Sequence, residues 1–168
     1  MLIEEKFVQF ISPFSMIVAG PSGSRKSILV RRIIKNHYML ITPQKEKRNV
    51  LWVYGQWQEL YNQQIQNVQI EYIEGFPSED EINIKNIDLI VIDDLMNEVA
   101  DDKRLGNLFT KTSHHLNLNV VFITQNLFYQ GKQIRNLHLN SQYLILMKNT
   151  RDASQIDILG RQLKISKS

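Results

Sequence analysis

Near the amino end of the chain, a strand pattern, a glycine-containing turn and a helix pattern follow one another directly. Met16-Ile17-Val18-Ala19 is a continuously apolar run, and after the turn Val30, Ile33 and Ile34 recur at helical spacing. The turn between them reads Gly20-Pro21-Ser22-Gly23-Ser24-Arg25-Lys26-Ser27. This order predicts a buried strand, a tight loop and a helix that begins at the loop. It restricts the chain to folds that contain such a unit.

The turn nearly matches the phosphate-binding P-loop, in which a glycine and four further residues precede Gly-Lys-Ser or Gly-Lys-Thr. Gly20, Lys26 and Ser27 stand at the required spacing, and Arg25 replaces the second glycine. Backbone N–H groups of such a loop converge on phosphate. We predict that Lys26 neutralises the β- and γ-phosphates of ATP and that the Ser27 hydroxyl ligates Mg²⁺. The residues predicted to bind the nucleotide are Gly20, Pro21, Ser22, Gly23, Ser24, Arg25, Lys26 and Ser27.

Arg25 leaves two interpretations of the loop open. A glycine at this position adopts any backbone dihedral and lets phosphate come close. Arginine adds a β-carbon and a cationic arm, which either blocks the nucleotide or swings out and adds positive charge. We expect Arg25 to weaken ATP binding. A further alternative is that the segment is only a glycine- and serine-rich turn with a chance lysine.

The composition is that of a single soluble domain spanning residues 1–168. The absence of cysteine excludes disulfides, thiolate catalysis and cysteine-based zinc sites. No apolar stretch approaches the roughly 20 residues of a membrane span, and no signal-peptide pattern opens the chain. We therefore expect an intracellular protein. Basic residues outnumber acidic ones by 20 to 17, and the basic carboxyl-terminal third is either a face for phosphate backbones or a solvated tail.

Short apolar runs alternate with helical patterns along the chain, which is typical of βαβ units and a mainly parallel sheet. Several of these runs are continuously apolar, so we expect an α/β fold with helices on both faces of the sheet. The expected strands are Ser15–Ala19, Val50–Tyr54, Gln69–Ile73, Asp88–Ile92, Val120–Thr124 and Tyr143–Met147. The expected helices are Lys26–Met39, Gln58–Gln64 and Lys103–His115, and the expected loops are Thr42–Asn49 and Gly75–Asp80.

Polar side chains end two of the apolar runs. Asp93 and Asp94 follow one run, which is the form of a Walker B element, and Gln125 follows another. A carboxylate beside a P-loop holds Mg²⁺, and Asp93 fits that role. We predict that Asp94 orients or deprotonates the attacking water and that Gln125 senses the γ-phosphate. Considered singly, each pattern is also compatible with a strand that ends in a polar turn.

Further motifs along almost the whole chain resemble those of one protein lineage. The chain is similar to the poxvirus-type genome-packaging ATPases of large DNA viruses and of Maverick/Polinton transposons, within the FtsK/HerA superfamily. The segments that carry this resemblance are Pro13-Phe14-Ser15, Tyr54-Gly55-Gln56-Trp57-Gln58-Glu59-Leu60-Tyr61, Glu74-Gly75-Phe76-Pro77, Asp93-Asp94-Leu95-Met96, Leu108-Phe109-Thr110, His114-His115, Gln125-Asn126-Leu127-Phe128 and Lys148-Asn149-Thr150-Arg151-Asp152-Ala153-Ser154-Gln155.

This resemblance implies a RecA-like P-loop NTPase core with an additional strand, here Val120–Thr124, between the P-loop strand and the Walker B strand. It implies ATP hydrolysis coupled to translocation of double-stranded DNA into a preformed viral capsid, inside the host cell at the site of virion assembly. It also implies a homo-oligomeric ring in which an arginine reaches the neighbour's γ-phosphate. Arg151 and Arg135 are the candidates for this arginine, followed by Arg104. The expected partners are double-stranded DNA, further copies of the chain, and capsid or portal vertex proteins.

Two other functions remain alternatives. One is a nucleotide-impaired assembly or scaffold protein derived from such an ATPase, and its direct support is Arg25. The other is a small P-loop phosphotransferase, although the chain lacks an obvious arginine-rich lid.

If Arg151 acts on a neighbouring subunit, two inactive variants should complement each other. Arginine fingers contribute about 10³–10⁵ in rate, so Arg151→Ala and Lys26→Ala should each be nearly inactive alone. Mixing them should restore part of the ATPase activity, because a mixed ring contains sites with an intact Lys26 and an intact neighbouring Arg151. Specific activity of the parent protein should also rise with its concentration. A rate independent of concentration would point to a monomeric enzyme.

Overall fold

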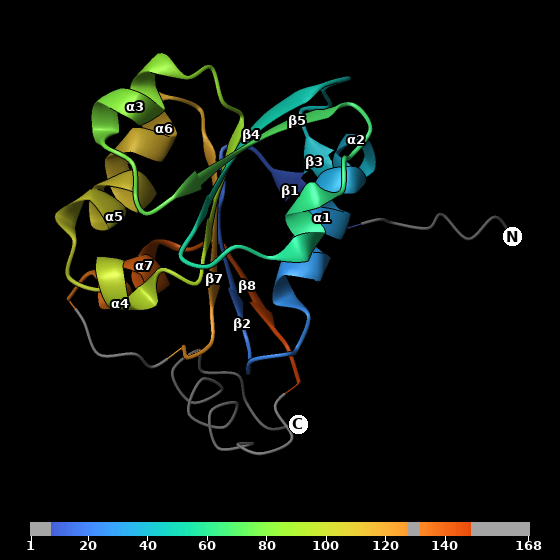
Figure 1. Cartoon of the computed structure of the whole chain (residues 1–168). Helices are drawn as coiled ribbons and strands as arrows, with labels where there is room; N and C mark the ends of the chain where they lie inside the picture. Colours follow the sequence, from blue (N-terminus) through green and yellow to red (C-terminus); the bar gives the residue numbers. More distant parts are fainter. Residues whose placement is uncertain (1–7, 128–131, 149–168) are drawn as a thin grey trace, which may run out of the picture.

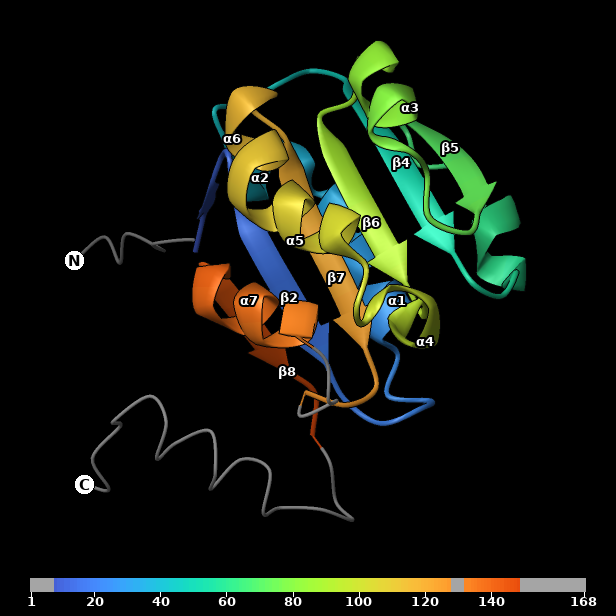
Figure 2. The same ribbon diagram turned by 90° about the vertical axis from the view of Figure 1, so that its left-hand side faces the viewer.

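Six parallel strands form the central sheet of the computed structural model, which describes residues 8–127 and 132–148. Their order across the sheet is β5-β4-β6-β7-β2-β8, and Figure 2 shows them side by side. Two further short strands form a separate parallel pair. The sheet strands are β2 (Ser15–Ala19), β4 (Arg48–Tyr54), β5 (Val68–Glu74), β6 (Leu89–Asp93), β7 (Asn119–Thr124) and β8 (Tyr143–Leu146), and the separate pair is β1 (Phe10–Ile11) with β3 (Ile41–Thr42).

Helices cover both faces of this sheet. Figure 1 shows α1 (Lys26–Lys35) and α2 (His37–Leu40) on one face and the helices from α3 to α7 on the other. The remaining helices are the 3₁₀ turn η1 (Glu59–Asn62), α3 (Glu79–Ile84), α4 (Met96–Val99), α5 (Lys103–Asn107), the π-helical turn η2 (Leu108–Thr112), α6 (Ser113–His115) and α7 (Lys132–Asn140). Within the described ranges, no helix has both the length and the hydropathy needed to cross a membrane.

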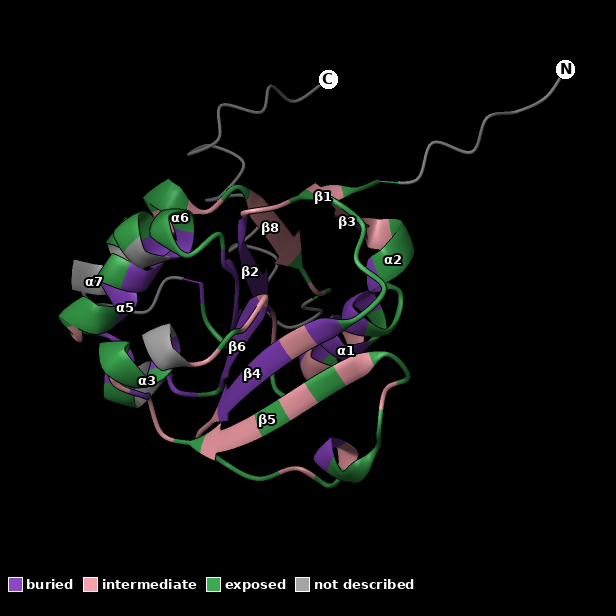
Figure 3. Ribbon diagram, turned by 90° about the horizontal axis from the view of Figure 1, so that it is seen from above, coloured by how far each residue is buried: buried purple, intermediate pink, exposed green. Residues whose placement is uncertain are grey.

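The core has two halves because successive residues of a strand point to opposite faces. Met16 and Val18 of β2 pack with Val30 of α1. Ile17 of the same strand belongs to the other half, together with Phe109 of η2. The strands β2, β6 and β7 are buried at every position. The edge strand β5 instead alternates between partly buried and exposed residues, as Figure 3 shows.

The expected strands are confirmed to within one or two residues at each end. The expected position of the 120–124 strand is confirmed as well, since β7 pairs with β2 on one side and with β6 on the other. The registers place Thr124 beside Ala19, and Phe122 beside both Ile17 and Ile92. The carboxyl ends of the P-loop strand, the Walker B strand and the strand between them therefore meet at one edge.

Four helical segments of the described residues differ from expectation. The predicted helix Lys26–Met39 is interrupted at Asn36, whose side-chain Nδ2 donates to the Arg32 carbonyl at 2.8 Å and competes with the helical backbone. The predicted loop Gly75–Asp80 overlaps the start of α3, which a capping box of Ser78 and Glu81 stabilises. Helices α4 and α7 were not predicted at all.

A buried amide joins three strands at the amino edge of the sheet, opposite the P-loop. Asn119 is 1% exposed, and its Oδ1 accepts from Ser12 Oγ at 2.7 Å and from the Phe14 N–H at 3.2 Å. Its Nδ2 donates to the Asp88 carbonyl at 3.0 Å. One side chain therefore ties the segments that enter β2, β6 and β7.

We predict that Asn119→Ala lowers the free energy of unfolding by about 2–4 kcal/mol, because it removes three hydrogen bonds and leaves buried groups without partners. Urea unfolding measures this change. Asn107→Ala is the matched control, since its amide makes an exposed contact to Glu79 at 3.3 Å and its loss should change stability by less than about 0.5 kcal/mol. Equal losses in the two variants would contradict the structural role of Asn119.

Candidate functional site

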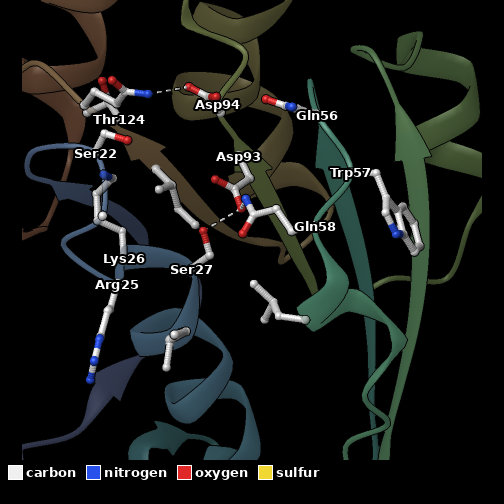
Figure 4. A pocket seen from close by; sticks show the side chains of 15 residues that line it. Ser22, Arg25, Lys26, Ser27, Gln56, Trp57, Gln58, Asp93, Asp94 and Thr124 are labelled. Atoms are coloured by element: carbon white, nitrogen blue, oxygen red, sulfur yellow. Dashed lines mark hydrogen bonds between the residues drawn. The ribbon is translucent and has the colours of Figure 1, made fainter.

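A cavity of about 470 Å³ opens at the carboxyl edge of the sheet. Lys26, Asp93 and Gln125 all line it, as the sequence predicted, and Figure 4 shows the P-loop on one side of Asp93 and the segment after β4 on the other. The roles of these three residues remain predictions. The complete lining is Ser22, Gly23, Arg25, Lys26, Ser27, Ile28, Gln56, Trp57, Gln58, Leu60, Asp93, Asp94, Ile123, Thr124 and Gln125.

The start of the P-loop is clamped between the two strands that flank β2. The Gly20 N–H donates to the Thr124 carbonyl at 3.2 Å, and the Met147 N–H donates to the Ala19 carbonyl at 2.8 Å. A β-carbon on residue 20 would lie 2.6 Å from the β-carbon of Met147, which is closer than real contacts allow. Gly20 is therefore required for this close packing, and the loop begins from a fixed point.

Lys26 folds its side chain back onto the loop. The side chain is largely buried, and Nζ donates to the carbonyls of Gly20 at 2.8 Å and Pro21 at 2.9 Å. Burial lowers the pKa of Lys26, whereas the charges of Asp93 and Asp94 raise it. A phosphate in the loop would offer this ammonium a charge-assisted partner stronger than neutral carbonyls.

Arg25 occupies a backbone conformation that glycine normally provides. It stands directly before α1 with φ 65° and ψ 31°, in the left-handed region. A residue with a β-carbon loses about 1–2 kcal/mol there. Its side chain is exposed and points away from Lys26 and Asp93 in Figure 4. Arginine therefore does not prevent the loop conformation; it makes that conformation strained, and its arm swings out.

Ser27 and Asp93 meet where a metal ion would be held. Ser27 Oγ donates to Asp93 Oδ2 at 2.8 Å, and the Tyr61 hydroxyl donates to the same oxygen at 2.9 Å. Asp93 is 2% exposed, and its burial raises its pKa, while the hydrogen bonds from Ser27 and Tyr61 act in the opposite direction. Burial also raises the pKa of Tyr61, so its hydroxyl stays protonated and available as a donor.

This set of donors fits Mg²⁺. Hydroxyl and carboxylate oxygens are the ligands that this hard cation prefers, and it usually takes only one or two carboxylates, with water and substrate phosphates completing its shell. Among the described residues, no three His, Cys, Asp or Glu side chains cluster as they would in a metal cage made wholly of protein. Ser27 and Asp93 are therefore the residues that would hold the ion, next to the loop that would hold the phosphates.

Asp94 faces the cavity from a strained position at the end of β6. Its φ is 58°, it is exposed, and its Oδ1 accepts from Gln125 Nε2 at 3.3 Å. A β-carbon on Gly55 would lie 2.6 Å from the Asp94 carbonyl oxygen, so the end of β4 must carry glycine to fit against this turn. Gln125, predicted to sense the γ-phosphate, thus contacts the carboxylate predicted to prepare the water.

Sequence analysis assigned no role to several residues that form the far wall of the cavity. Gln56, Trp57, Gln58 and Leu60 line it, and Gln58 Nε2 approaches Asp93 Oδ2 at 3.5 Å. The signal was the same one that identified Asp93: polar and aromatic residues directly after a buried strand, β4, at the carboxyl edge of a parallel sheet.

Of the three candidate arginine fingers, Arg104 is the one whose side-chain contacts the structure describes. Arg104 pairs with Asp102 at 2.6 Å and lies over the Phe76 ring at 5.3 Å. Arg135 belongs to α7. Arg151 lies outside the described residues.

No protein-family profile and no curated protein sequence matches this chain, whereas several solved structures are similar to it. The genome packaging NTPase B204 of Sulfolobus turreted icosahedral virus 2, solved in complex with AMP, is 13% identical, with a TM-score of 0.53 over 88% of this chain and 81% of B204. The ATPase DotB of Legionella pneumophila is 17% identical, with a TM-score of 0.48 over 90% of this chain, which spans only 37% of DotB. The likeness to B204 confirms the α/β fold of a P-loop NTPase.

Replacing Arg25 tests whether the strained backbone limits nucleotide binding. Arg25→Gly removes both the arm and the strain, whereas Arg25→Ala removes the arm and keeps a β-carbon at positive φ. We predict that Arg25→Gly binds ATP about tenfold more tightly than Arg25→Ala, equivalent to ~1.4 kcal/mol, because only glycine holds the loop amides in this conformation without strain. Calorimetric titration at one salt concentration measures both affinities. Equal values would mean that the β-carbon does not affect binding.

Proposed function

We propose that this chain is an ATP-hydrolysing motor subunit that translocates double-stranded DNA into a viral capsid. The observation that carries the proposal is one cavity lined by the P-loop, the Asp93 carboxylate that Ser27 contacts, and the Asp94–Gln125 pair. The DNA substrate and the capsid are inferred from the sequence motifs, and the structural likeness to a viral genome packaging NTPase agrees with them.

The P-loop, Ser27, Asp93 and Asp94 have different parts in the proposed hydrolysis. The loop amides and Lys26 bind the β- and γ-phosphates of ATP. Ser27 and Asp93 would hold Mg²⁺, which would supply positive charge to offset that of the phosphates. Asp94 orients a water and accepts its proton as the water oxygen bonds to the γ-phosphorus. The bond from that phosphorus to the β-γ bridging oxygen breaks, giving ADP and inorganic phosphate.

Gln125 connects this reaction to movement in the proposed motor. Its amide contacts Asp94 and lies at the end of β7, whose neighbours are the P-loop strand and the Walker B strand. Release of the γ-phosphate removes a hydrogen-bond partner from this position and allows the helices next to the sheet to shift. In a ring of identical subunits, Arg151 would reach a neighbouring site. Such shifts would then occur in one subunit after another and move the DNA. The ring would act in the host cell, bound to the capsid or portal vertex.

One observation favours a second candidate, a scaffold protein that has lost effective hydrolysis. Arg25 holds a strained conformation, and Lys26 is already satisfied by the carbonyls of Gly20 and Pro21. Both features oppose nucleotide binding. A scaffold protein that keeps the fold and the ring does not need to hydrolyse ATP, so it could retain both features without losing its function.

An ATPase assay with and without double-stranded DNA distinguishes these functions. We predict Mg²⁺-dependent ATP hydrolysis that double-stranded DNA stimulates. Absence of turnover at every DNA and protein concentration would favour the scaffold, and release of ADP only with a phosphoryl acceptor would identify a phosphotransferase.

Asp94→Asn should then separate binding from hydrolysis. Asparagine tolerates the left-handed backbone of residue 94 but cannot accept a proton, so turnover should fall about 10²-fold or more while Mg·ATP affinity changes by only a few-fold. Asp80→Asn, which removes the same charge on the exposed surface of α3, is the control and should hydrolyse ATP like the parent. If Asp94→Asn hydrolyses ATP as fast as the parent protein, another group must orient and deprotonate the water.

A further inference from the structure

Tyr61 connects the segment after β4 directly to the predicted metal ligand. It lies in η1, it is 4% exposed, and its hydroxyl donates to Asp93 Oδ2 at 2.9 Å. Ser27 donates to the same oxygen at 2.8 Å. Two hydroxyls from different sides of the site therefore fix one carboxylate oxygen.

Four aromatic side chains hold the Tyr61 ring in place. Tyr72 of β5 stacks on it with centroids 4.8 Å apart and planes 24° apart. Trp52 lies at 5.5 Å, Tyr54 at 5.6 Å, and Trp57 meets the ring edge-on at 5.3 Å. Because aromatic rings packed in this way have few alternative positions, the hydroxyl is held at a defined point.

A second connection ties the same segment to α1 without involving Asp93. Arg31 stands one helical turn after Ser27, and it donates to the Tyr72 hydroxyl at 2.5 Å and to the carbonyl of Gln63, directly after η1. Its side chain is buried. Tyr61 therefore keeps its position relative to α1 even if the Ser27–Asp93 hydrogen bond opens.

We propose that Tyr61 is the positioning residue of Asp93. Its hydroxyl holds Oδ2 in place while Ser27 gives up its hydrogen bond to this oxygen and binds a metal ion instead. The inference rests on the proposed nucleotide and Mg²⁺ site. It assigns to the 56–61 segment the task of presenting the carboxylate in one orientation before the metal arrives. Partners that orient metal-ligating groups typically affect metal affinity by 10–100-fold.

Tyr61→Phe tests this role because it deletes the hydroxyl and keeps the ring. Titration of Mn²⁺ into the protein with saturating ADP, followed by electron paramagnetic resonance, should show metal affinity reduced by about 10-fold or more. ADP affinity in EDTA should stay within about twofold. Excess Mg²⁺ should restore the rate of ATP hydrolysis, which it would not do if the variant were merely misfolded; circular dichroism and thermal unfolding check the fold.

Tyr54→Phe is the matched control, since it removes a hydroxyl from the same aromatic cluster and keeps the ring that packs on Tyr61. Its Mn²⁺ affinity should equal that of the parent. If the parent binds Mn²⁺·ADP and Tyr61→Phe binds it equally well, the role of Tyr61 is refuted and the proposed function stands. If the parent binds no Mn²⁺·ADP, both are refuted. Equal weakening in the two variants would also overturn the inference, because it would show a general effect of the cluster.

Discussion

The parallel pairing of β7 with both β2 and β6 is the interaction on which the site depends. It sets the distance between the strand that enters the P-loop and the strand that ends in Asp93. All three strands are buried along their whole length, so their registers are fixed by the packing of both core halves. The hydrogen bond from Ser27 to Asp93 is a consequence of this pairing, since the two residues are 66 positions apart in the sequence.

The same edge concentrates features that reduce stability. Arg25 and Asp94 both hold positive φ angles, and Lys26 and Asp93 are charged groups with little exposure. Strained and buried polar groups persist where the surrounding structure determines them strongly, and they gather at functional sites. Here the rigid surroundings are identifiable: the buried strands β2, β6 and β7 below the site and the aromatic cluster around Tyr61 beside it. Arg25 and Asp94 both lie outside the apolar strands that carry the site, in the turns that follow them.

Sequence reasoning succeeded where one physical signal dominated. Continuous apolar runs identified the strands, and residues at their carboxyl ends identified Lys26, Asp93, Asp94 and Gln125 as neighbours. The order of the strands required the resemblance to a family, because apolar periodicity says nothing about which strands pair. Helix α3 was predictable from Ser78 and Glu81 and was overlooked. Helix α7 was not, since residues 132–140 carry apolar side chains only at Ile134, Leu137 and Leu139, which leaves the helical pattern weak.

Contacts of Tyr61 were beyond sequence reasoning for a different reason. Its hydroxyl reaches Asp93, which lies 32 positions further along the chain, and no local pattern encodes that contact. The positive φ of Arg25 could be predicted from the sequence only in part. The motif indicated that a glycine belonged there, but only the structure shows that the arginine accepts the glycine conformation and turns its arm outward.

The clamp on Gly20 has a consequence for how the chain acquires its site. Ala19 and Gly20 bond to Met147 and Thr124, so the P-loop is anchored by strands made more than 100 residues later. Such non-local pairings form late, because the entropy of closing a long loop must be overcome first. During synthesis, the loop cannot be clamped until residue 147 has left the ribosome. Nucleotide binding to this protein would therefore require the chain as far as Met147, and ATP would stabilise only molecules in which β8 is paired with β2.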